Sequence, residues 1–189
     1  MTGIKEQLRS RFPVLESERL LLRGLVPEDS EAMYRCMTDP AVRAFTQINP
    51  GKLLFPGRLY RYFEESYRTL RDLHFAVESM EERRWIGLCS LQYWSAEGKT
   101  ARLGYLLAPA HWNRGYATEA ARCLLDFGFG TLGLDRIEAR CRTDNPASER
   151  VLQKCGLRFE GPLAAVSRRG EGDPKALKLY VAERNSFET

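Results

Sequence analysis

The run Trp112 to Thr118 (WNRGYAT) combines features that suit the binding of an anion. It follows an apolar stretch and opens a segment whose apolar residues have helical spacing. The first turn of a helix leaves backbone N–H groups without partners, and the helix dipole adds a partial positive charge there. Gly115 and Ala117 let an anion approach the backbone closely, and Arg114 adds a positive charge. These features predict a phosphate cradle along this run.

The cradle is a modest signal when taken alone. Glycine between a strand and a helix is often ordinary turn chemistry. The sequence contains neither the GxxxxGK[ST] pattern of a Walker loop nor the GxGxxG pattern of a dinucleotide site. The common nucleotide-binding classes are therefore disfavoured.

A second run, Asn145 to Leu157 (NPASERVLQKCGL), follows the first after one intervening strand. Asn145 suits the N-cap of a helix, Pro146 suits its first position, and Gly156 ends it. An asparagine cap uses its side-chain oxygen and leaves its NH₂ group available for a ligand.

Together the two runs resemble the cofactor-binding motifs of the GNAT (Gcn5-related) N-acetyltransferases. Trp112, Gly115 and Ala117 occupy the named places of the family's [Q/R]-x-x-G-x-[G/A] motif, with tryptophan in the first. The run from Asn145 to Leu157 is similar to the family's N-x-A-S-x-x-[VL]-L-x-K-x-G-[FL]. The likeness extends over roughly Glu18 to Val181 and is greatest to the RimJ/RimL-like branch, which acetylates the N-termini of ribosomal proteins.

The resemblance implies a GNAT-like fold in the mixed α/β (α+β) class, as a single domain over residues 1–189 with a core of about 18–182. It implies a central twisted mixed sheet of about seven strands, flanked by about four helices. Two central parallel strands, 101–108 and 136–142, would splay apart. The pantetheine arm of acetyl-CoA, the co-substrate, would lie in the gap.

The resemblance also assigns roles to site residues. Backbone groups of Tyr105, Leu106 and Leu107 would pair with pantetheine, and a backbone N–H there would polarise the thioester carbonyl. Asn145 would bond pantetheine, and Ser148 would lie near the sulfur. The pyrophosphate would be held by the amides of Asn113, Arg114, Gly115, Tyr116, Ala117 and Thr118.

The acid and base positions depart from those of relatives. Arg140 replaces a glutamate five residues before the motif asparagine, Leu152 replaces a tyrosine seven residues after it, and Arg102 replaces an acidic residue. No match therefore names the general base, and the arginines favour an acceptor with negative groups. The hydroxyl of Ser148 is the preferred proton donor to the thiolate. Tyr105 is the second candidate, because a tyrosine in a strand is more often part of the packing.

Strands and helices must position these motifs. Alternating and continuous apolar runs predict strands at 18–25, 74–78, 85–94, 101–108, 136–142, 157–161 and 177–182. Helical spacing and caps predict helices at 27–37, 57–72, 116–129 and 146–155. The second helix would bury a face formed by Leu59, Tyr62, Phe63, Tyr67 and Leu70. A polar hairpin tip is expected at 168–174.

Composition limits the remaining classes. The 29 basic and 25 acidic residues are interspersed, so a nucleic-acid-binding surface is not expected. The sequence has no apolar run near the roughly 20 residues that cross a bilayer and no secretory leader, which favours a cytoplasmic location. Five cysteines without a CxxC pair indicate buried thiols, and with only two histidines no metal site is expected. His111 lies beside the cradle with no partner visible in the sequence.

Two classes of function remain open. The first is an enzyme that acetylates a primary amine, which is a protein N-terminus or else a small amine such as an antibiotic or a polyamine. The second is a GNAT-like module that binds acyl-CoA as a sensor without catalysis. The expected partners are acetyl-CoA and an amine acceptor, with no direct nucleic-acid or membrane contact, in a monomer or a homodimer.

Overall fold

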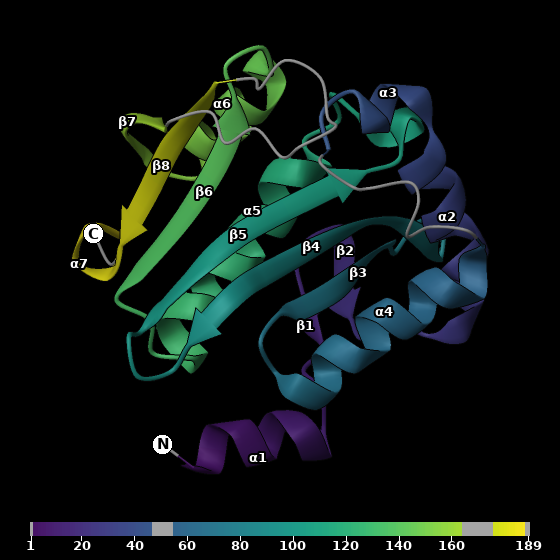
Figure 1. Cartoon of the computed structure of the whole chain (residues 1–189), viewed down its shortest axis with the longest axis horizontal. Coiled ribbons are helices and arrows are strands. Elements are labelled where there is room, and N and C mark those ends of the chain that lie inside the picture. The colour runs from purple at the N-terminus through teal and green to yellow at the C-terminus, as the bar shows by residue number, and fades with distance from the viewer. Residues whose placement is uncertain (1, 47–54, 164–175, 188–189) are drawn as a thin grey trace, which may run out of the picture.

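A computed structural model describes residues 2–46, 55–163 and 176–187, and its centre is one mixed sheet (Figure 1). Within these ranges the strand order is β1-β2-β3-β4-β5-β6-β8-β7. The strands are β1 (Leu15–Glu16), β2 (Leu20–Arg23), β3 (Leu73–Ser79), β4 (Arg84–Ser95), β5 (Thr100–Leu107), β6 (Arg136–Arg142), β7 (Arg158–Leu163) and β8 (Leu177–Glu183). All neighbours are antiparallel except β5 and β6.

The predicted mixed sheet with one parallel pair is confirmed. Its eighth strand is the two-residue β1, too short to leave an alternating pattern in the sequence. In β6 the predicted alternation holds, because Ile137, Ala139 and Cys141 are buried. The predicted hairpin tip at 168–174 lies outside the described residues.

The described helices are α1 (Thr2–Ser10), α2 (Ser30–Thr38), α3 (Pro40–Arg43), α4 (Pro56–Thr69), α5 (Tyr116–Asp126), α6 (Pro146–Lys154) and α7 (Arg184–Phe187). The four predicted helices are present, and α1 and the short α3 and α7 are additional. Asp39 accepts the N–H of Ala41 at 2.8 Å and so caps α3 immediately after α2 ends.

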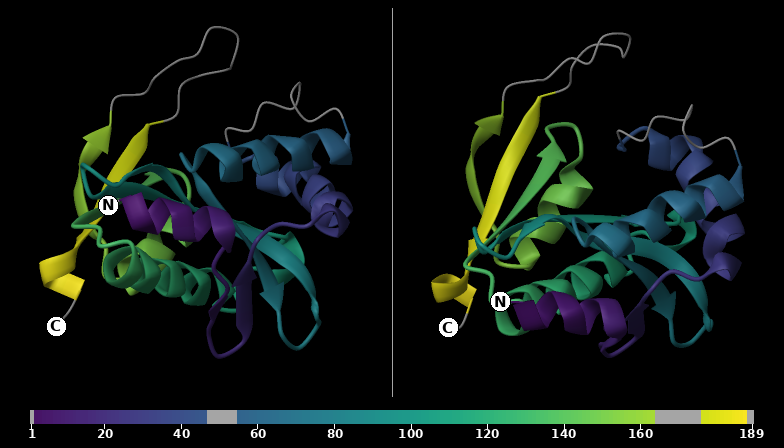
Figure 2. Two further views of the ribbon diagram at one scale, coloured as in Figure 1. Left: turned by 90° about the horizontal axis from the view of Figure 1, so that it is seen from below. Right: turned by 60° about the horizontal axis from the view of Figure 1, so that its bottom comes forward.

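Helices cover both faces of the sheet. α5 packs behind it, where its apolar residues join the larger core (Figure 1). α2 and α4 pack in front of β3 and β4 over a second core that includes Met33, Leu59 and Phe63. The views in Figure 2 place α1 beside α5, on the side of the sheet away from α4. No helix in the described part of the chain is long and apolar enough to cross a membrane.

Two details of the predicted helices are wrong. Tyr62 is 59% exposed because the buried stripe of α4 runs through Leu59 and Phe63, four residues apart, and turns Tyr62 outward. The helix also ends at Thr69, since Leu70 adopts a left-handed conformation with φ 52°.

The end of α5 shows why a glycine is needed there. The chain widens into a π turn over Phe127–Thr131, earlier than the predicted helix end. A Cβ on Gly128 would lie 2.7 Å from Cδ1 of Ile137 on β6. Only glycine permits this close approach of the turn to the sheet.

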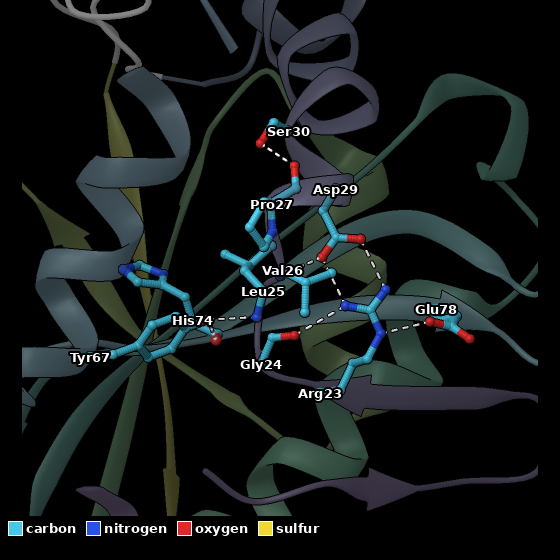
Figure 3. A network of polar contacts seen from close by, with 10 residues as sticks. All are labelled: Arg23, Gly24, Leu25, Val26, Pro27, Asp29, Ser30, Tyr67, His74 and Glu78. Atoms are coloured by element: carbon cyan, nitrogen blue, oxygen red, sulfur yellow. Dashed lines mark hydrogen bonds and ion pairs between the residues drawn. The ribbon is translucent and has the colours of Figure 1, made fainter. Parts of the chain in front are cut away.

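A buried polar network docks the front helices on the sheet (Figure 3). Arg23, at the end of β2, donates to both carboxylate oxygens of Asp29 at 2.8 and 2.9 Å and to Glu78 on β3 at 2.6 Å. Asp29 also accepts the N–H of Val26 at 2.9 Å, which fixes the turn that leads into α2. The shared carboxylates raise the pKa of Arg23 far above its usual value against the opposing effect of burial.

Tyr67 makes the second half of this network (Figure 3). Its hydroxyl donates to the carbonyl of His74 at 2.6 Å and accepts the N–H of Leu25 at 3.0 Å, so α4 is tied to β3 and to the chain after β2. Burial lowers the pKa of His74 to about 4, so this histidine stays neutral near pH 7.

We expect Asp29→Asn to lower the free energy of unfolding by about 2–3 kcal/mol, because it leaves the largely buried Arg23 short of a carboxylate. The exposed pair of Glu65 and Arg68 on α4 supplies the control. Glu65→Gln should leave the urea midpoint almost unchanged. Equal shifts in the two variants would show that the buried network contributes no more than a surface pair.

Candidate active site

The parallel pair of strands separates at the centre of the sheet. β5 and β6 are paired only where Thr100–Leu103 of β5 lie opposite Arg136–Ala139 of β6. Beyond these residues β5 stays bonded to β4 and β6 stays bonded to β8. A cleft of about 550 Å³ lies at the separation and is lined by both strands. The predicted splayed pair is therefore confirmed.

The exposed backbone groups of β5 follow from strand alternation. The N–H of Ala108 donates to the carbonyl of Ile86 on β4 at 2.9 Å. Because successive residues of a strand turn their polar groups to opposite sides, those of Tyr105 and Leu107 face the gap and those of Leu106 face β4. Tyr105 and Leu107 thus supply the backbone edge that fits an extended amide-bearing arm, and Leu106 lines the cleft.

One of these edge groups already has a partner. The indole Nε1 of Trp112 donates to the carbonyl of Leu107 at 2.8 Å. The side chain of Trp112 therefore folds back over the end of β5 and lines the cleft. This bond fixes the start of the cradle relative to the strand.

The cradle has the conformation that an anion site needs. Gly115 is the N-cap of α5 with φ 82°, a left-handed conformation that favours glycine. No side chain caps this helix end. Within the described residues no acceptor is found for the N–H groups of Tyr116, Ala117 or Thr118. The helix end fits a phosphate group.

Arg19 supports the cradle from β1–β2, and the sequence carries no local signal for it. Its guanidinium donates to Glu119 of α5 at 2.8 Å and to the carbonyl of Arg114 at 3.1 Å, and it lies 4.5 Å from the ring centroid of Tyr116. Ser17 donates to the same Glu119 carboxylate at 2.8 Å. Two segments about a hundred residues apart are thus joined at the helix start.

The fold supplies His111 with a partner that the sequence does not show. Its Nε2 lies 3.1 and 3.3 Å from the carboxylate oxygens of Glu82, in the turn between β3 and β4. Burial tends to raise the pKa of Glu82, but hydrogen bonds from His111 and Arg84 outweigh it and lower the value. Arg114 lies 3.8 Å from the same carboxylate. Because His111 does not line the cleft, this cluster acts on the loop and not on the reaction.

Ser148 and Tyr105 meet in the cleft from distant parts of the chain. Asn145 accepts the N–H of Ser148 at 3.0 Å, which confirms it as the N-cap of α6. The hydroxyls of Tyr105 and Ser148 lie 2.9 Å apart, and both residues line the cleft. Burial raises the pKa of Tyr105 well above its usual value, against a smaller opposing effect of the Ser148 hydrogen bond. Tyr105 therefore stays protonated and can donate.

The predicted site residues fall into two groups. Those in the cleft lining are Tyr105, Leu106, Leu107, Ala117, Asn145 and Ser148, together with the substituted positions Arg102, Arg140 and Leu152. Those outside it are Asn113, Arg114, Gly115, Tyr116 and Thr118, which form the cradle at one end. Prediction from sequence missed the wall that Val42 of α3 and Phe45 just after it provide, because no motif marks these residues.

Comparison with known proteins identifies the family. The acetyltransferase (GNAT) domain matches residues 19–158. This chain belongs to the GNAT acetyltransferase family. It is 33% identical over 170 residues to the uncharacterized N-acetyltransferase YoaA of Bacillus subtilis (strain 168), covering 89% of this chain and 96% of YoaA.

Two further relatives differ in the acceptors that their names state. The ribosomal-protein-serine acetyltransferase of Escherichia coli (strain K12) is 32% identical over 83 residues, covering 44% of this chain and 46% of that protein. The spermidine N-acetyltransferase of Vibrio cholerae, solved with CoA and spermine, shares the fold at 20% identity with a TM-score of 0.81, covering 92% and 100% of the two chains.

This GNAT acetyltransferase therefore uses acetyl-CoA as the acetyl donor and transfers the group to an amine. The splayed strands, the backbone edge of Tyr105 and Leu107 and the uncapped start of α5 fit that donor. The edge suits the amides of pantetheine, and the helix start suits the pyrophosphate.

We expect Gly115→Glu to weaken CoA binding at least 30-fold. The added carboxylate would repel the pyrophosphate, and a residue with a Cβ is strained at φ 82°. Gly115→Asn separates the two causes, since asparagine tolerates this conformation without adding charge. It should bind within about threefold of wild type. Isothermal titration with CoA measures both.

Gly57→Glu is the matched control, because Gly57 lies in the first turn of α4 with open space around it. Its CoA affinity should equal that of wild type. If Gly115→Glu also bound normally, the pyrophosphate would lie elsewhere.

Proposed function

We propose that this acetyltransferase acetylates the N-terminal α-amine of a protein, as the RimJ/RimL-like branch does. The main support is the composition of the cleft, because its described lining contains no Asp, Glu or His that could act as a general base. The likeness to a ribosomal-protein-serine acetyltransferase supports the same acceptor.

The acceptor pKa explains why the missing base favours an α-amine. An α-amine has a pKa near 8, so about a quarter of it is neutral at pH 7.5. A lysine or polyamine amine has a pKa near 10.4, so only about 0.1% is neutral. Without an Asp, Glu or His in the described lining to act as general base, the α-amine has an advantage of roughly 200-fold in the neutral, reactive fraction.

In the proposed reaction the neutral amine attacks the thioester carbonyl carbon, and the C–N bond forms. The developing oxyanion accepts a hydrogen bond from the β5 edge at Tyr105 or Leu107. The C–S bond then breaks. The Ser148 hydroxyl donates a hydrogen bond to the departing sulfur, and the Tyr105 hydroxyl lies within hydrogen-bond distance of Ser148. Overall one proton passes from nitrogen to sulfur, so the reaction is neutral.

The raised pKa of Tyr105 limits its role. A thiol has a pKa near 8.5, below that of a tyrosine, so complete proton transfer from Tyr105 to the thiolate is uphill. The hydroxyl pair therefore stabilises the sulfur through hydrogen bonds while the proton released by the nitrogen reaches it. Positioning of the two substrates supplies the rest of the rate.

We expect thiol release from acetyl-CoA with a peptide that has a free N-terminus and an internal lysine. The same peptide with a blocked N-terminus should release none. Activity at limiting acceptor should rise tenfold per pH unit and level off near pH 8, as the α-amine becomes neutral. Binding of CoA without thiol release from any acceptor would instead support a sensor.

We expect Ser148→Ala to lower kcat about 10- to 100-fold and to change the CoA dissociation constant less than threefold. Tyr105→Phe should lower kcat similarly, and the double variant should be little worse than either single variant because the hydroxyls share one hydrogen bond. Ser10→Ala, in α1 and outside the cleft lining, is the control. Fully additive losses would contradict a shared role.

A further inference from the structure

Three arginines lie on the front face of β5 and β6, where they line the cleft. Strand register places Arg102 of β5 beside Glu138 of β6, so Arg140 and Arg142, two and four residues on, lie on the same face as Arg102. In Figure 1, α4 lies over the β2 and β3 side of this face, whereas β5 and β6 face the viewer. All three arginines line the cleft.

Their counter-charges are unequal. Arg142 donates to both carboxylate oxygens of Asp144 at 2.8 and 2.7 Å, so its charge is compensated. Glu138 accepts from Arg136 at 3.4 Å and is not part of the cleft lining. Within the described residues neither Arg102 nor Arg140 has a carboxylate within ion-pair distance.

Arg102 packs on an aromatic ring and has a hydrogen-bond donor without a partner in the described chain. Its guanidinium carbon lies 4.5 Å from the ring centroid of Tyr93, a distance at which cation and ring attract each other. Its Nε is buried and has no hydrogen-bond partner among the described residues. A buried donor without a partner is unfavourable, so a ligand that supplies an oxygen there is favoured. Arg140 is exposed and lines the same cleft.

The cleft lining in the described chain contains three arginines and no Asp or Glu. A polycation would find no opposite charge there, whereas a carboxylate would find two uncompensated guanidinium groups. Guanidinium and carboxylate groups form paired, directional hydrogen bonds. The charge of the cleft thus selects among primary amines.

We propose that the acceptor is an N-terminal peptide with an acidic side chain at its second or third residue, bound by Arg102 and Arg140. This inference rests on the proposed function, which places the thioester beside Tyr105. Arg102 precedes Tyr105 by three residues, about 10 Å along the strand. An acidic side chain two residues from an α-amine spans a similar distance in an extended peptide.

The test compares peptides that begin Ala-Asp-Asp, Ala-Asn-Asn and Ala-Lys-Lys and are otherwise identical. At low salt kcat/KM should be at least tenfold higher for the Asp peptide than for the Asn peptide, and lowest for the Lys peptide. Added salt should reduce the difference, because it screens the exposed Arg140. Free glutamate and phosphoserine, assayed in parallel, should be poorer acceptors; if either surpassed the Asp peptide, the anion would come from a small molecule and the peptide assignment would be wrong.

Charge reversal supplies a readout that loss of structure would not produce. Arg140→Glu should invert the preference toward the Lys peptide while CoA affinity stays unchanged, and Arg102→Gln should abolish the preference for Asp over Asn. Arg158→Glu is the control, because Arg158 is 72% exposed on β7 and does not line the cleft. An unchanged preference in Arg140→Glu would overturn the inference.

Different results would contradict the proposed N-terminal acetylation and the proposed preference for an acidic peptide. If the Asp and Asn peptides are acetylated equally by the wild-type protein, the charge selection is wrong and the proposed function stands. If no peptide releases thiol, the proposed function is wrong. Binding of the N-acetylated Asp and Asn peptides to the CoA-bound protein then tests the charge selection by itself, and equal dissociation constants would refute it.

Discussion

The structure depends on a sheet that is left unpaired at its centre. After Leu103 and Ala139 the two parallel strands stop bonding to each other, and each remains bonded to its outer neighbour. Backbone polar groups in the middle of a sheet are stable only when something satisfies them. Here the Leu107 carbonyl accepts the indole N–H of Trp112, and a tyrosine–serine hydrogen bond joins β5 to α6. The edge that remains fits the amides of the acetyl donor, and we propose that it binds them.

Keeping that gap open with fixed walls requires support from far along the chain. Arg23 and Asp29 dock the turn before α2, and Tyr67 docks α4, so the front wall is tied to β2 and β3. On the other side Arg19 and Glu119 join the turn between β1 and β2 to the first turn of α5. Each connection is a charged or hydroxyl group bound to several partners, which fixes orientation as well as distance. Reaction between two bound substrates depends on such fixed positions.

The features predictable from sequence are the locally encoded ones. β6 was placed to the residue because its apolar side chains alternate strictly, and the cap of α6 was found because asparagine and proline have one favoured order there. Features that depend on distant partners were not predictable. Only the fold brings Glu82 within hydrogen-bond distance of His111 and Arg19 over the ring of Tyr116. Helical spacing also does not determine the rotation of α4 that leaves Tyr62 exposed. The cofactor motifs were therefore clear from the sequence, whereas the supports and the acceptor wall were not.

The arginines also bear on how the cleft, whose described lining has no Asp, Glu or His, can use an amine. An ammonium group that enters a space lined by uncompensated guanidinium groups is repelled, and like charges favour its neutral form. The positions where relatives carry an acid or a base would then act through the electric field of the cleft and not through proton abstraction. An acidic side chain on the acceptor would anchor the peptide at Arg102 and Arg140 while its amine, further along the gap, loses its proton to water. Selection of the acceptor and activation of its amine would follow from one charge arrangement.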